Sequence, residues 1–457
     1  MDLSPYYEKS KDYFLSNETL TYEFRIDKLC RLEEALRRNE HEVFEALKAD
    51  LNKSPYEAFM TEVGIVYSEL KETRKKLKSW MKPKKKMVSI AQMPGIGYEY
   101  KSPYGVVLIM SPWNYPFQLT ILPLIGAIAA GNCAFVKPSA YSPKTSLIIK
   151  KILSEAFDEK YIKTVEGGRE ENQNLLNLPF DYIFFTGGMN VGKHVMECAS
   201  KHLIPFTLEL GGKSPCIVDQ TADLNKAAKR LLFGKLMNAG QTCIAPDYLL
   251  VEKDIHEDFV EILKNTYRKL FPSVEYFKAN FPWIINQKHF DRLCGLIDGE
   301  KYWMGLEGKT YDKSRQIPLT IIDNATLDSK VMGEEIFGPI LPVIEWENEN
   351  EIISLIRENP NPLALYIFSK DDRICKDLIK KVNFGGATIN DTLLHVASSK
   401  LAFGGVGRSG IGRYHGIKSF ETFSHTKSVL KKSLYFDAAF RHHPFKNPDG
   451  KLPEQFF

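Results

Sequence analysis

The segment Val106-Val107-Leu108-Ile109-Met110 is a β-rich run of the kind that forms a strand. Two further β-rich runs follow at 134–136 and 182–185, and a helical stretch at 147–157 lies between them. Strands that alternate with helices along a chain predict a doubly wound parallel sheet. A second alternating stretch, from residue 214 to about residue 384, predicts another α/β domain.

The rest of the chain adds helices and a small β element to these two domains. At 457 residues the chain exceeds the size at which one hydrophobic core usually splits. The first 80 residues predict amphipathic helices, because apolar residues recur there at helical spacing with charges between them. Residues 88–100 predict a hairpin that turns near Pro94-Gly95. The basic run Lys84-Lys85-Lys86 before it is of a kind that can touch phosphate or lipid, but a solvated linker is the simpler interpretation.

Composition and charge exclude several classes of function. With 44% hydrophobic and 26% charged residues the chain is ordinary for a soluble globular protein, and a net charge of +4 argues against nucleic-acid binding. The seven cysteines are scattered and form no Cys-x-x-Cys pair, which favours a reducing compartment and no disulfide framework or zinc site. The pair His442-His443 has no third ligand nearby in the sequence, so we expect no bound metal.

The sequence also bears on membrane association. The most apolar stretch, 119–136, is interrupted by Pro123, Gly126, Gly131 and Asn132, and therefore predicts a buried helix and strand rather than a bilayer span. The start Met1-Asp2-Leu3-Ser4-Pro5 lacks the basic and apolar regions of a secretory signal, and residues 434–457 are polar. We expect a cytoplasmic protein with no stable membrane anchor.

Two short segments carry the groups for thioester chemistry. Gly240-Gln241-Thr242-Cys243 places a cysteine at the end of a tight turn, and Leu208-Glu209-Leu210-Gly211-Gly212-Lys213 places a carboxylate upstream. A thiolate can attack an electrophilic carbon, and a carboxylate in a half-dry pocket can then activate water. The thiolate requires a site that lowers the pKa of Cys243 or supplies a base. Apolar neighbours of Glu209 should raise the pKa of its carboxyl. A lone cysteine is otherwise usually a small buried hydrophobe.

Three further runs accompany these segments in a fixed order: Ser111-Pro112-Trp113-Asn114-Tyr115-Pro116, Phe185-Thr186-Gly187-Gly188 and Gly333-Glu334-Glu335-Ile336-Phe337-Gly338-Pro339. Two C-terminal runs, Phe403-Gly404-Gly405-Val406-Gly407-Arg408-Ser409-Gly410-Ile411-Gly412 and Phe420-Glu421-Thr422-Phe423-Ser424-His425, complete the set. Together they resemble the aldehyde dehydrogenase superfamily, and in particular its class 3 branch of fatty and aromatic aldehyde dehydrogenases. The resemblance extends from about residue 22 to about residue 430.

The resemblance implies a role for each reacting group. Cys243 would be the nucleophile that forms a thiohemiacetal and then a thioester, and Glu209 would be the general base that activates water. Asn114 would stabilise the oxyanion together with the backbone N–H of Cys243. From the residues alone, Asn114 could instead serve only the turn between Pro112 and Pro116.

A glycine-containing segment, 187–193, follows a predicted strand and opens a helix, which is the context for a phosphate at a helix N-terminus. It is not a Gly-x-Gly-x-x-Gly fingerprint. It resembles a P-loop, but His194 stands where the Mg²⁺-binding Ser or Thr of an NTPase would be. The family resemblance instead implies that Gly187, Gly188 and Gly192 bind the pyrophosphate of NAD or NADP.

The resemblance places five more residues at the cofactor. Lys137 would contact the adenine ribose, Glu335 the nicotinamide ribose and Phe337 the nicotinamide ring, and Trp113 belongs to the same set. Ala140 stands where many relatives have a glutamate that binds the ribose hydroxyls. An acidic residue there favours NAD and repels a 2′-phosphate, so Ala140 predicts tolerance of NADP.

The resemblance also places Tyr115, Leu119, Thr242 and His395 in the aldehyde tunnel. An apolar and aromatic lining suits medium- to long-chain aliphatic or aromatic aldehydes. Aromatic residues at such positions are as often part of the core, and His395 is the least secure member of this set.

The resemblance implies a division of the chain into a cofactor domain, a catalytic domain, an oligomerisation flap that makes a homodimer, and a polar tail. Their expected ranges are 1–81 with 101–211, 212–412, 82–100 with 413–440, and 441–457, respectively. Two other functions stay open: a CoA-acylating dehydrogenase, in which CoA takes the acyl group, and a catalytically silent scaffold. Glu209 favours water over CoA, and the complete set of reacting groups argues against a scaffold.

Overall fold

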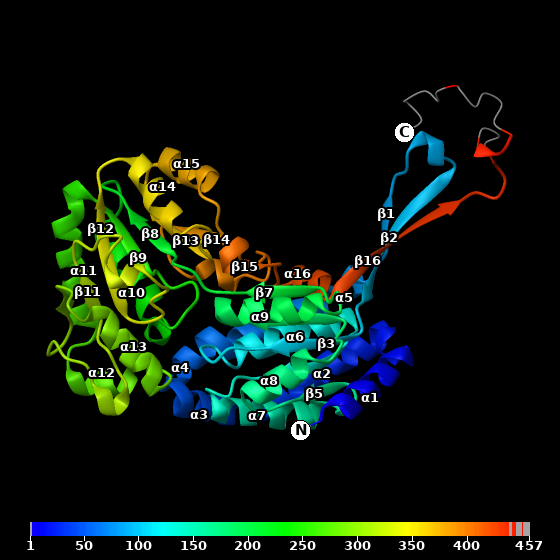
Figure 1. The fold of residues 1–457 in the computed structure, drawn as a ribbon, viewed down its shortest axis with the longest axis horizontal. Coiled ribbons are helices and arrows are strands. Elements are labelled where there is room, and N and C mark those ends of the chain that lie inside the picture. The colour runs from blue at the N-terminus through cyan, green and yellow to red at the C-terminus, as the bar shows by residue number, and fades with distance from the viewer. Residues whose placement is uncertain (1, 438–440, 445–449, 451–457) are drawn as a thin grey trace.

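The computed structural model describes residues 2–437, 441–444 and 450. The N-terminal segment is helical, as its apolar spacing predicted, and it packs on the first sheet (Figure 1). A π-helical turn, η2 (Phe59–Val63), interrupts the helical run between α4 and α5. The helices are α1 (Ser4–Leu15), α2 (Tyr22–Arg38), α3 (Glu40–Leu51), α4 (Pro55–Ala58) and α5 (Gly64–Trp80).

The first sheet has the strand order β15-β7-β6-β3-β4-β5 and is parallel except for β15. From β3 the chain moves outward to β4 and β5, then crosses back to β6 and β7, so the predicted doubly wound topology is confirmed. The strands are β3 (Val106–Met110), β4 (Cys133–Lys137), β5 (Ile162–Thr164), β6 (Tyr182–Thr186), β7 (Phe206–Glu209) and β15 (Gly410–Ile411). The helices between them are α6 (Gln118–Ala130), α7 (Pro143–Ala156), α8 (Arg169–Leu176) and α9 (Met189–Ser200).

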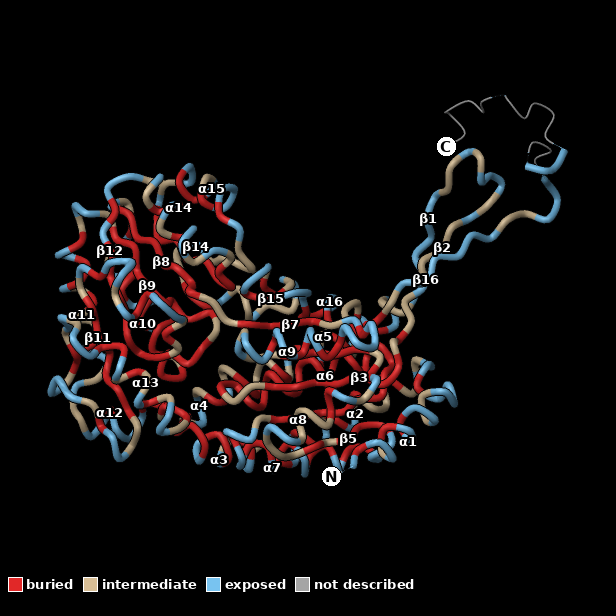
Figure 2. Tube along the Cα trace, viewed as in Figure 1, coloured by how far each residue is buried: buried red, intermediate tan, exposed pale blue. Residues whose placement is uncertain are grey.

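The most apolar stretch of the chain forms α6 and β4, and every residue of both is buried. Figure 2 shows that the first sheet, and the sheet of the second α/β domain described below, lie in the buried interior. In the described part of the chain, every helix falls short of the length and apolar character that a membrane crossing requires. The prediction of a buried helix and strand is therefore confirmed.

The second predicted α/β domain is also present. Its sheet has the order β10-β11-β12-β9-β8-β13-β14 and is parallel except for β10. Its strands are β8 (Pro215–Val218), β9 (Tyr248–Glu252), β10 (Trp303–Met304), β11 (Thr320–Ile322), β12 (Ile340–Trp346), β13 (Ala364–Phe368) and β14 (Gly386–Ile389). Its helices are α10 (Leu224–Leu236), α11 (His256–Leu270), α12 (Val274–Asn280), α13 (Gln287–Ile297), α14 (Glu349–Glu358) and α15 (Asp372–Lys381).

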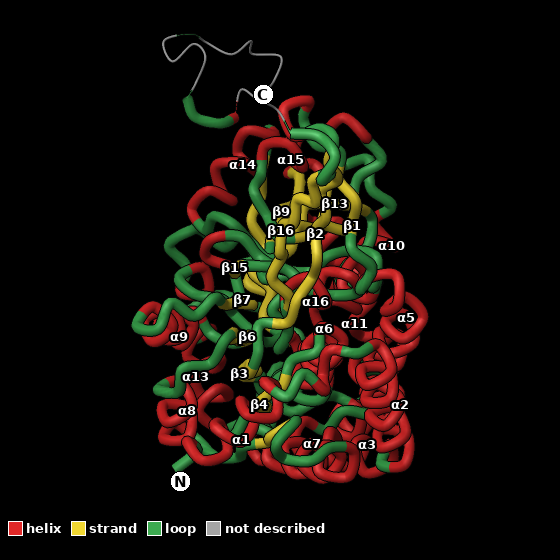
Figure 3. Tube along the Cα trace, turned by 90° about the vertical axis from the view of Figure 1, so that its right-hand side faces the viewer, coloured by secondary structure: helices red, strands yellow, loops and turns green. Residues whose placement is uncertain are grey.

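A third, antiparallel sheet projects from the body of the molecule as an arm (Figures 1 and 3). It contains β1 (Lys84–Lys86), β2 (Gly95–Pro103) and β16 (Ser424–Lys432). The predicted hairpin at 88–100 is therefore wrong in its bounds: the lysine run is the first strand, and Gly95 begins the second. All three lysines of β1 are exposed, as expected of a solvated segment, and charged side chains protect an edge strand from pairing with other chains.

The chain does not leave the first domain for good at residue 211. Gly410 and Ile411, which we expected in the catalytic domain, pair with Glu209 and Leu208 of β7. Helix α16 (Ile417–Thr422) then packs on α6 before β16 enters the arm. The expected polar tail, 441–457, lies for the most part outside the described residues.

Candidate active site

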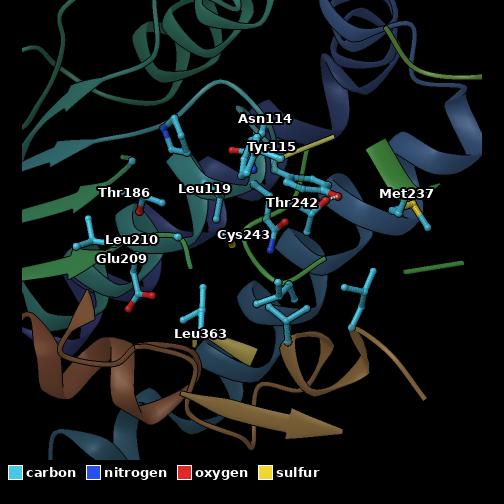
Figure 4. A pocket seen from close by; sticks show the side chains of 18 of the residues that line it. Asn114, Tyr115, Leu119, Thr186, Glu209, Leu210, Met237, Thr242, Cys243 and Leu363 are labelled. Carbon is cyan, nitrogen blue, oxygen red and sulfur yellow. Dashed lines mark hydrogen bonds between the residues drawn. The ribbon is translucent and has the colours of Figure 1, made fainter. Parts of the chain in front are cut away.

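A cavity of about 600 Å³ lies where loops from both α/β domains meet (Figure 4). Eleven of the predicted site residues line it. They are Trp113, Asn114, Tyr115, Leu119, Gly187, Gly188, Glu209, Thr242, Cys243, Glu335 and Phe337. In the close view Cys243 lies between Asn114 and Leu363, with Glu209 to one side.

The first domain presents its groups at the carboxyl ends of its strands. Asn114 follows β3, Gly187 follows β6, and Glu209 is the last residue of β7. Strands β3 and β6 are neighbours at the point where the direction of winding reverses. In open α/β sheets, ligands bind at this point.

The second domain presents Cys243 on an irregular turn between α10 and β9. Asn238, Ala239 and Gly240 have successive φ values of 52°, 55° and 74°, so all three lie in the left-handed region. A Cβ on Gly240 would lie 2.4 Å from the carbonyl oxygen of Gly338, which explains why glycine is needed there. The buried side chain of Gln241 fixes the turn by donating to the carbonyls of Asn238 (3.0 Å) and Trp283 (2.9 Å).

Asn114 joins the two loops. Its Nδ2 donates to the carbonyl oxygen of Gln241 at 3.0 Å. This bond uses one hydrogen of the amide and leaves the other for a ligand in the cavity, which Asn114 lines. The structure therefore places Asn114 against the turn that carries Cys243, and both residues line the same cavity.

Burial raises the pKa of the Cys243 thiol, and the carboxylates of Glu335 and Glu209 raise it further. Hydrogen bonds from the backbone N–H groups of Cys243 and Ile244 lower the pKa, but burial and the two acidic groups outweigh them. Of the two predicted routes to a thiolate, removal of the proton by a base is the one that this environment supports.

Glu209 is fully buried, and neither carboxylate oxygen has a hydrogen-bond partner among the described residues. Burial raises the pKa of this carboxyl well above its usual range, and only Arg413 opposes the shift. The predicted rise in the pKa of Glu209 is confirmed. A carboxyl that has no internal partner and faces a cavity is suited to take a proton from a water molecule there.

The other end of the cavity fits a dinucleotide. Burial, followed by the nearby Asp247, raises the pKa of Glu335 to about 8. Its Oε1 has no partner in the described part of the chain, so it is free to accept hydrogen bonds from ribose hydroxyls. The indole of Trp113 lies 5.4 Å from the ring of Phe337 and 5.1 Å from that of His289, measured between centroids. Gly188 opens α9 without a side-chain cap, which leaves backbone N–H groups for an anionic pyrophosphate.

Three predicted cofactor residues lie outside the cavity lining. Lys137 is buried at the end of β4, and its Nζ donates to the carbonyls of Pro138 (2.9 Å) and Gly167 (2.7 Å). Ala140 is exposed just beyond it. Gly192 is buried within α9, where an added Cβ would lie 2.8 Å from Leu210, so its visible role is the close packing of α9.

The predicted substrate residues divide in the same way. Tyr115 and Thr242 both line the cavity, and their hydroxyl oxygens lie 2.6 Å apart in a hydrogen bond. His395 is not among the residues that line this cavity, although its neighbours Leu394 and Val396 are. Its Nδ1 lies 2.9 Å from the hydroxyl oxygen of Thr388, and its ring stacks against Phe403, which lines the cavity.

Sequence reasoning missed several lining residues. Apolar ones come from the N-terminal helices, from α10 and from the 393–397 loop: Met60, Ile65, Phe233, Met237, Leu393, Leu394 and Val396. Polar ones, His289 and Arg292, come from α13 at the end with Glu335. An amphipathic pattern marks which face of a helix is apolar, but it does not distinguish core from cavity wall.

Comparison with known proteins agrees with this fold and site. Residues 2–429 match the Aldehyde dehydrogenase family. The 4,4′-diaponeurosporen-aldehyde dehydrogenase of Staphylococcus aureus is 46% identical over 96% of this chain and 95% of its own. The "Aldehyde dehydrogenase, dimeric NADP-preferring" of Rattus norvegicus is 41% identical over 94% and 95%, respectively. A solved structure described as the substrate-bound state of Staphylococcus aureus AldH has a TM-score of 0.94 and 44% identity, and covers 97% of this chain and 96% of that one.

A thiol-lined cavity between two α/β domains, one of them doubly wound, defines a dinucleotide-dependent oxidoreductase. The chain belongs to the aldehyde dehydrogenase family, and the predicted likeness to class 3 is confirmed. It is an NAD(P)-dependent enzyme that oxidises aldehydes to carboxylic acids.

Proposed function

We propose that Cys243, Glu209 and Asn114 carry out this oxidation. The observation that supports the proposal is their convergence on one cavity from three separate segments of the chain. Cys243 Sγ adds to the aldehyde carbon, and the carbonyl oxygen becomes an oxyanion held by the second amide hydrogen of Asn114 and the backbone N–H of Cys243. When bound, NAD or NADP supplies the hydride acceptor. Glu335, Phe337, Trp113, Gly187 and Gly188 would hold it, with Lys137, Ala140 and Gly192 nearby.

Loss of the hydride leaves an acyl group on Cys243 as a thioester. Glu209 then takes a proton from water, the hydroxide adds to the thioester carbon, and the carbon–sulfur bond breaks to release the carboxylic acid. Neither oxygen of Glu209 is occupied by another described group, which supports this role. A general base that can activate water also favours water over CoA as the acyl acceptor.

We infer that the substrates are medium- to long-chain aliphatic or aromatic aldehydes. The wall of the cavity near Tyr115 and Leu119 is built mainly from aliphatic and aromatic side chains, which suits an extended apolar substrate. The name of the Staphylococcus aureus relative, 4,4′-diaponeurosporen-aldehyde dehydrogenase, is in keeping with this class.

One assay tests the whole proposal. Reduced cofactor is followed with aldehydes of increasing chain length, with and without CoA, for the wild type and Cys243→Ser. We expect rates that rise with chain length, no requirement for CoA, and free acid as the product. Acyl-CoA as the main product would contradict the role of Glu209, and an active Cys243→Ser would contradict the role of the thiol.

We propose in addition that the arm makes the enzyme a homodimer. Val429 and Leu430 of β16 and Leu434 beyond it are exposed, and apolar residues on a projecting sheet are suited to cover another subunit. A relative carries "dimeric" in its name. Light scattering should give twice the subunit mass, and a stable monomer at micromolar concentration would contradict this.

A further inference from the structure

A buried ion pair lies behind the wall of the active site, outside its lining. Lys53 and Glu62 both have fully buried side chains, and Lys53 Nζ lies 2.6 Å from Glu62 Oε1. The same Nζ donates to the backbone carbonyl of Asn114 at 2.9 Å and lies 4.0 Å from the ring centroid of Tyr115. One ammonium group therefore contacts two consecutive residues of the active-site loop.

Glu62 holds the same loop from its other end. Its Oε2 accepts hydrogen bonds from the backbone N–H groups of Phe117 (2.8 Å) and Gln118 (3.1 Å), where α6 begins. Glu62 lies within the π-helical turn η2. A turn of this kind is wider than an α-helical turn, so its side chains point in directions that a regular α-helix would not give them. The pair thus fixes both the carbonyl of Asn114 and the start of the next helix.

The cysteine turn is tied to the same point. Asn238 Nδ2 donates to the carbonyl of Asn114 (2.8 Å) and to that of Gln241 (3.1 Å). The backbone N–H of Asn238 in turn donates to Glu57 Oε1 at 2.8 Å. The carbonyl of Asn114 consequently has two donors, one from the N-terminal helices and one from the turn that carries Cys243.

Stability alone is a weak reason for such a pair. Removing two charges from water costs free energy, and well-packed apolar residues often stabilise a protein as much as a buried ion pair does. The contacts of this pair are concentrated on residues 114–118, at the loop whose amide faces the reacting carbon. Small errors in the placement of such a group have large effects on rate.

We propose that Lys53, with Glu62 as its counter-ion, is a positioning residue for the oxyanion site. Its ammonium fixes the backbone of Asn114, so that the free hydrogen of Nδ2 stays directed at the developing oxyanion. The proposal rests on the role assigned to Asn114 under the proposed function.

The test uses the full-length double variant Lys53→Met/Glu62→Gln, which removes both charges, keeps the side-chain lengths and retains an oxygen to accept from Phe117 and Gln118. The rate constant of the first burst of reduced cofactor is measured at saturating substrates, together with cofactor affinity and thermal stability. We expect a burst about 10- to 100-fold slower with cofactor affinity unchanged.

Lys163→Met is the matched control, since Lys163 is also mostly buried, pairs with Glu159 at 2.7 Å and lies 3.8 Å from the ring of Tyr6, yet it lies outside the cavity lining. It should leave the burst unchanged. Lys53→Arg alone serves as the second variant if the double variant fails to fold, because it keeps a positive charge beside the buried Glu62 while it changes the donor to Asn114.

The background Asn114→Ala separates this inference from the proposed function. If Lys53 acts through Asn114, the double variant should slow the burst of the wild type and have no further effect in Asn114→Ala. An unchanged burst in the double variant, or an equal slowing in both backgrounds, would overturn the positioning role while leaving Asn114 in place. A normal burst in Asn114→Ala itself would instead overturn the role of Asn114, and the positioning role with it.

Discussion

Glu209 and Cys243 face the same cavity but are placed there by different means. Glu209 ends a regular strand, and its backbone pairs with Thr186 on one side and Gly410 on the other. Cys243 follows three left-handed residues, 238–240, and its turn is held by side chains rather than by a ladder of backbone hydrogen bonds. Both supports use distant segments, but Glu209 is held by regular backbone pairing and Cys243 by side-chain hydrogen bonds to an irregular turn.

The difference suggests a division of labour within the site. The base is on a strand paired on both sides, where a substitution of its side chain should leave the backbone in place. The nucleophile is on a turn in which left-handed residues such as Ala239 carry strain that the surrounding contacts must offset. Variants of Cys243 and Glu209 should therefore differ in which step of the reaction they abolish and in which step they leave intact.

The largest effect should come from Cys243→Ala. Without a nucleophile, turnover should fall by at least about 10,000-fold, while binding of NAD or NADP stays close to that of the wild type. Cys216→Ala is the control, because burial also raises the pKa of Cys216 but this residue lies in β8, outside the cavity lining. Steady-state rates and cofactor titrations measure both. Substantial turnover by Cys243→Ala would show that another group is the nucleophile.

Glu209→Gln should have the next largest effect, and a selective one. The base is needed chiefly to hydrolyse the thioester, so turnover should fall by about 100- to 10,000-fold while a burst of reduced cofactor persists. Stopped-flow absorbance separates the two phases. An equal loss of burst and turnover would mean that Glu209 acts before hydride transfer or supports the structure only.

A substitution at the cofactor end of the site should have a smaller effect, because Ala140 is exposed and lies outside the segments that carry Glu209 and Cys243. Ala140→Glu should restore a charge-assisted bond to the ribose, of about 1.5–3 kcal/mol, and shift kcat/KM towards NAD by about 10- to 150-fold. Ala140→Gln, which has no charge, should shift it less. A wild type that already rejects NADP by several orders of magnitude would show that another residue selects the cofactor.

The smallest effect should be a gradual one, the dependence of kcat on pH. Burial raises the pKa of Glu209, so its carboxylate form should become more abundant as the pH rises, about tenfold for each unit of pH below that pKa. Where hydrolysis limits turnover, kcat should rise with pH, and the rise should be absent in Glu209→Gln. A kcat with the same dependence on pH in the wild type and in Glu209→Gln would contradict the assignment of that dependence to Glu209.

The same contrast explains what could be predicted from the sequence. Both sheets could be predicted because alternating elements follow from local pattern, whereas the positions of Asn114 and Glu209 at the cavity were implied by the resemblance to the family. The first strand of the arm could not, since Lys84-Lys85-Lys86 has little preference for β structure and becomes a strand only by pairing with residues 97–99.

Residues whose role depends on distant contacts were equally hidden. Whether His395 lines the cavity depends on such contacts, since its imidazole is held by Thr388 and Phe403. Lys53 gave no signal as one lysine in a helical region, and its burial depends on Glu62 and on a loop sixty residues further along. Patterns in sequence report local structure, and these positions are decided by tertiary packing.

Strand β15 has a consequence for how the chain is made. Because β7 lies at one end of the parallel set, its outer edge has no partner until residues 410–411 have left the ribosome and paired with it. An open edge of this kind is a site for pairing with other chains. Nascent chains that end before residue 410 should therefore be prone to aggregate through β7, and the first domain reaches its final form only when synthesis is almost complete.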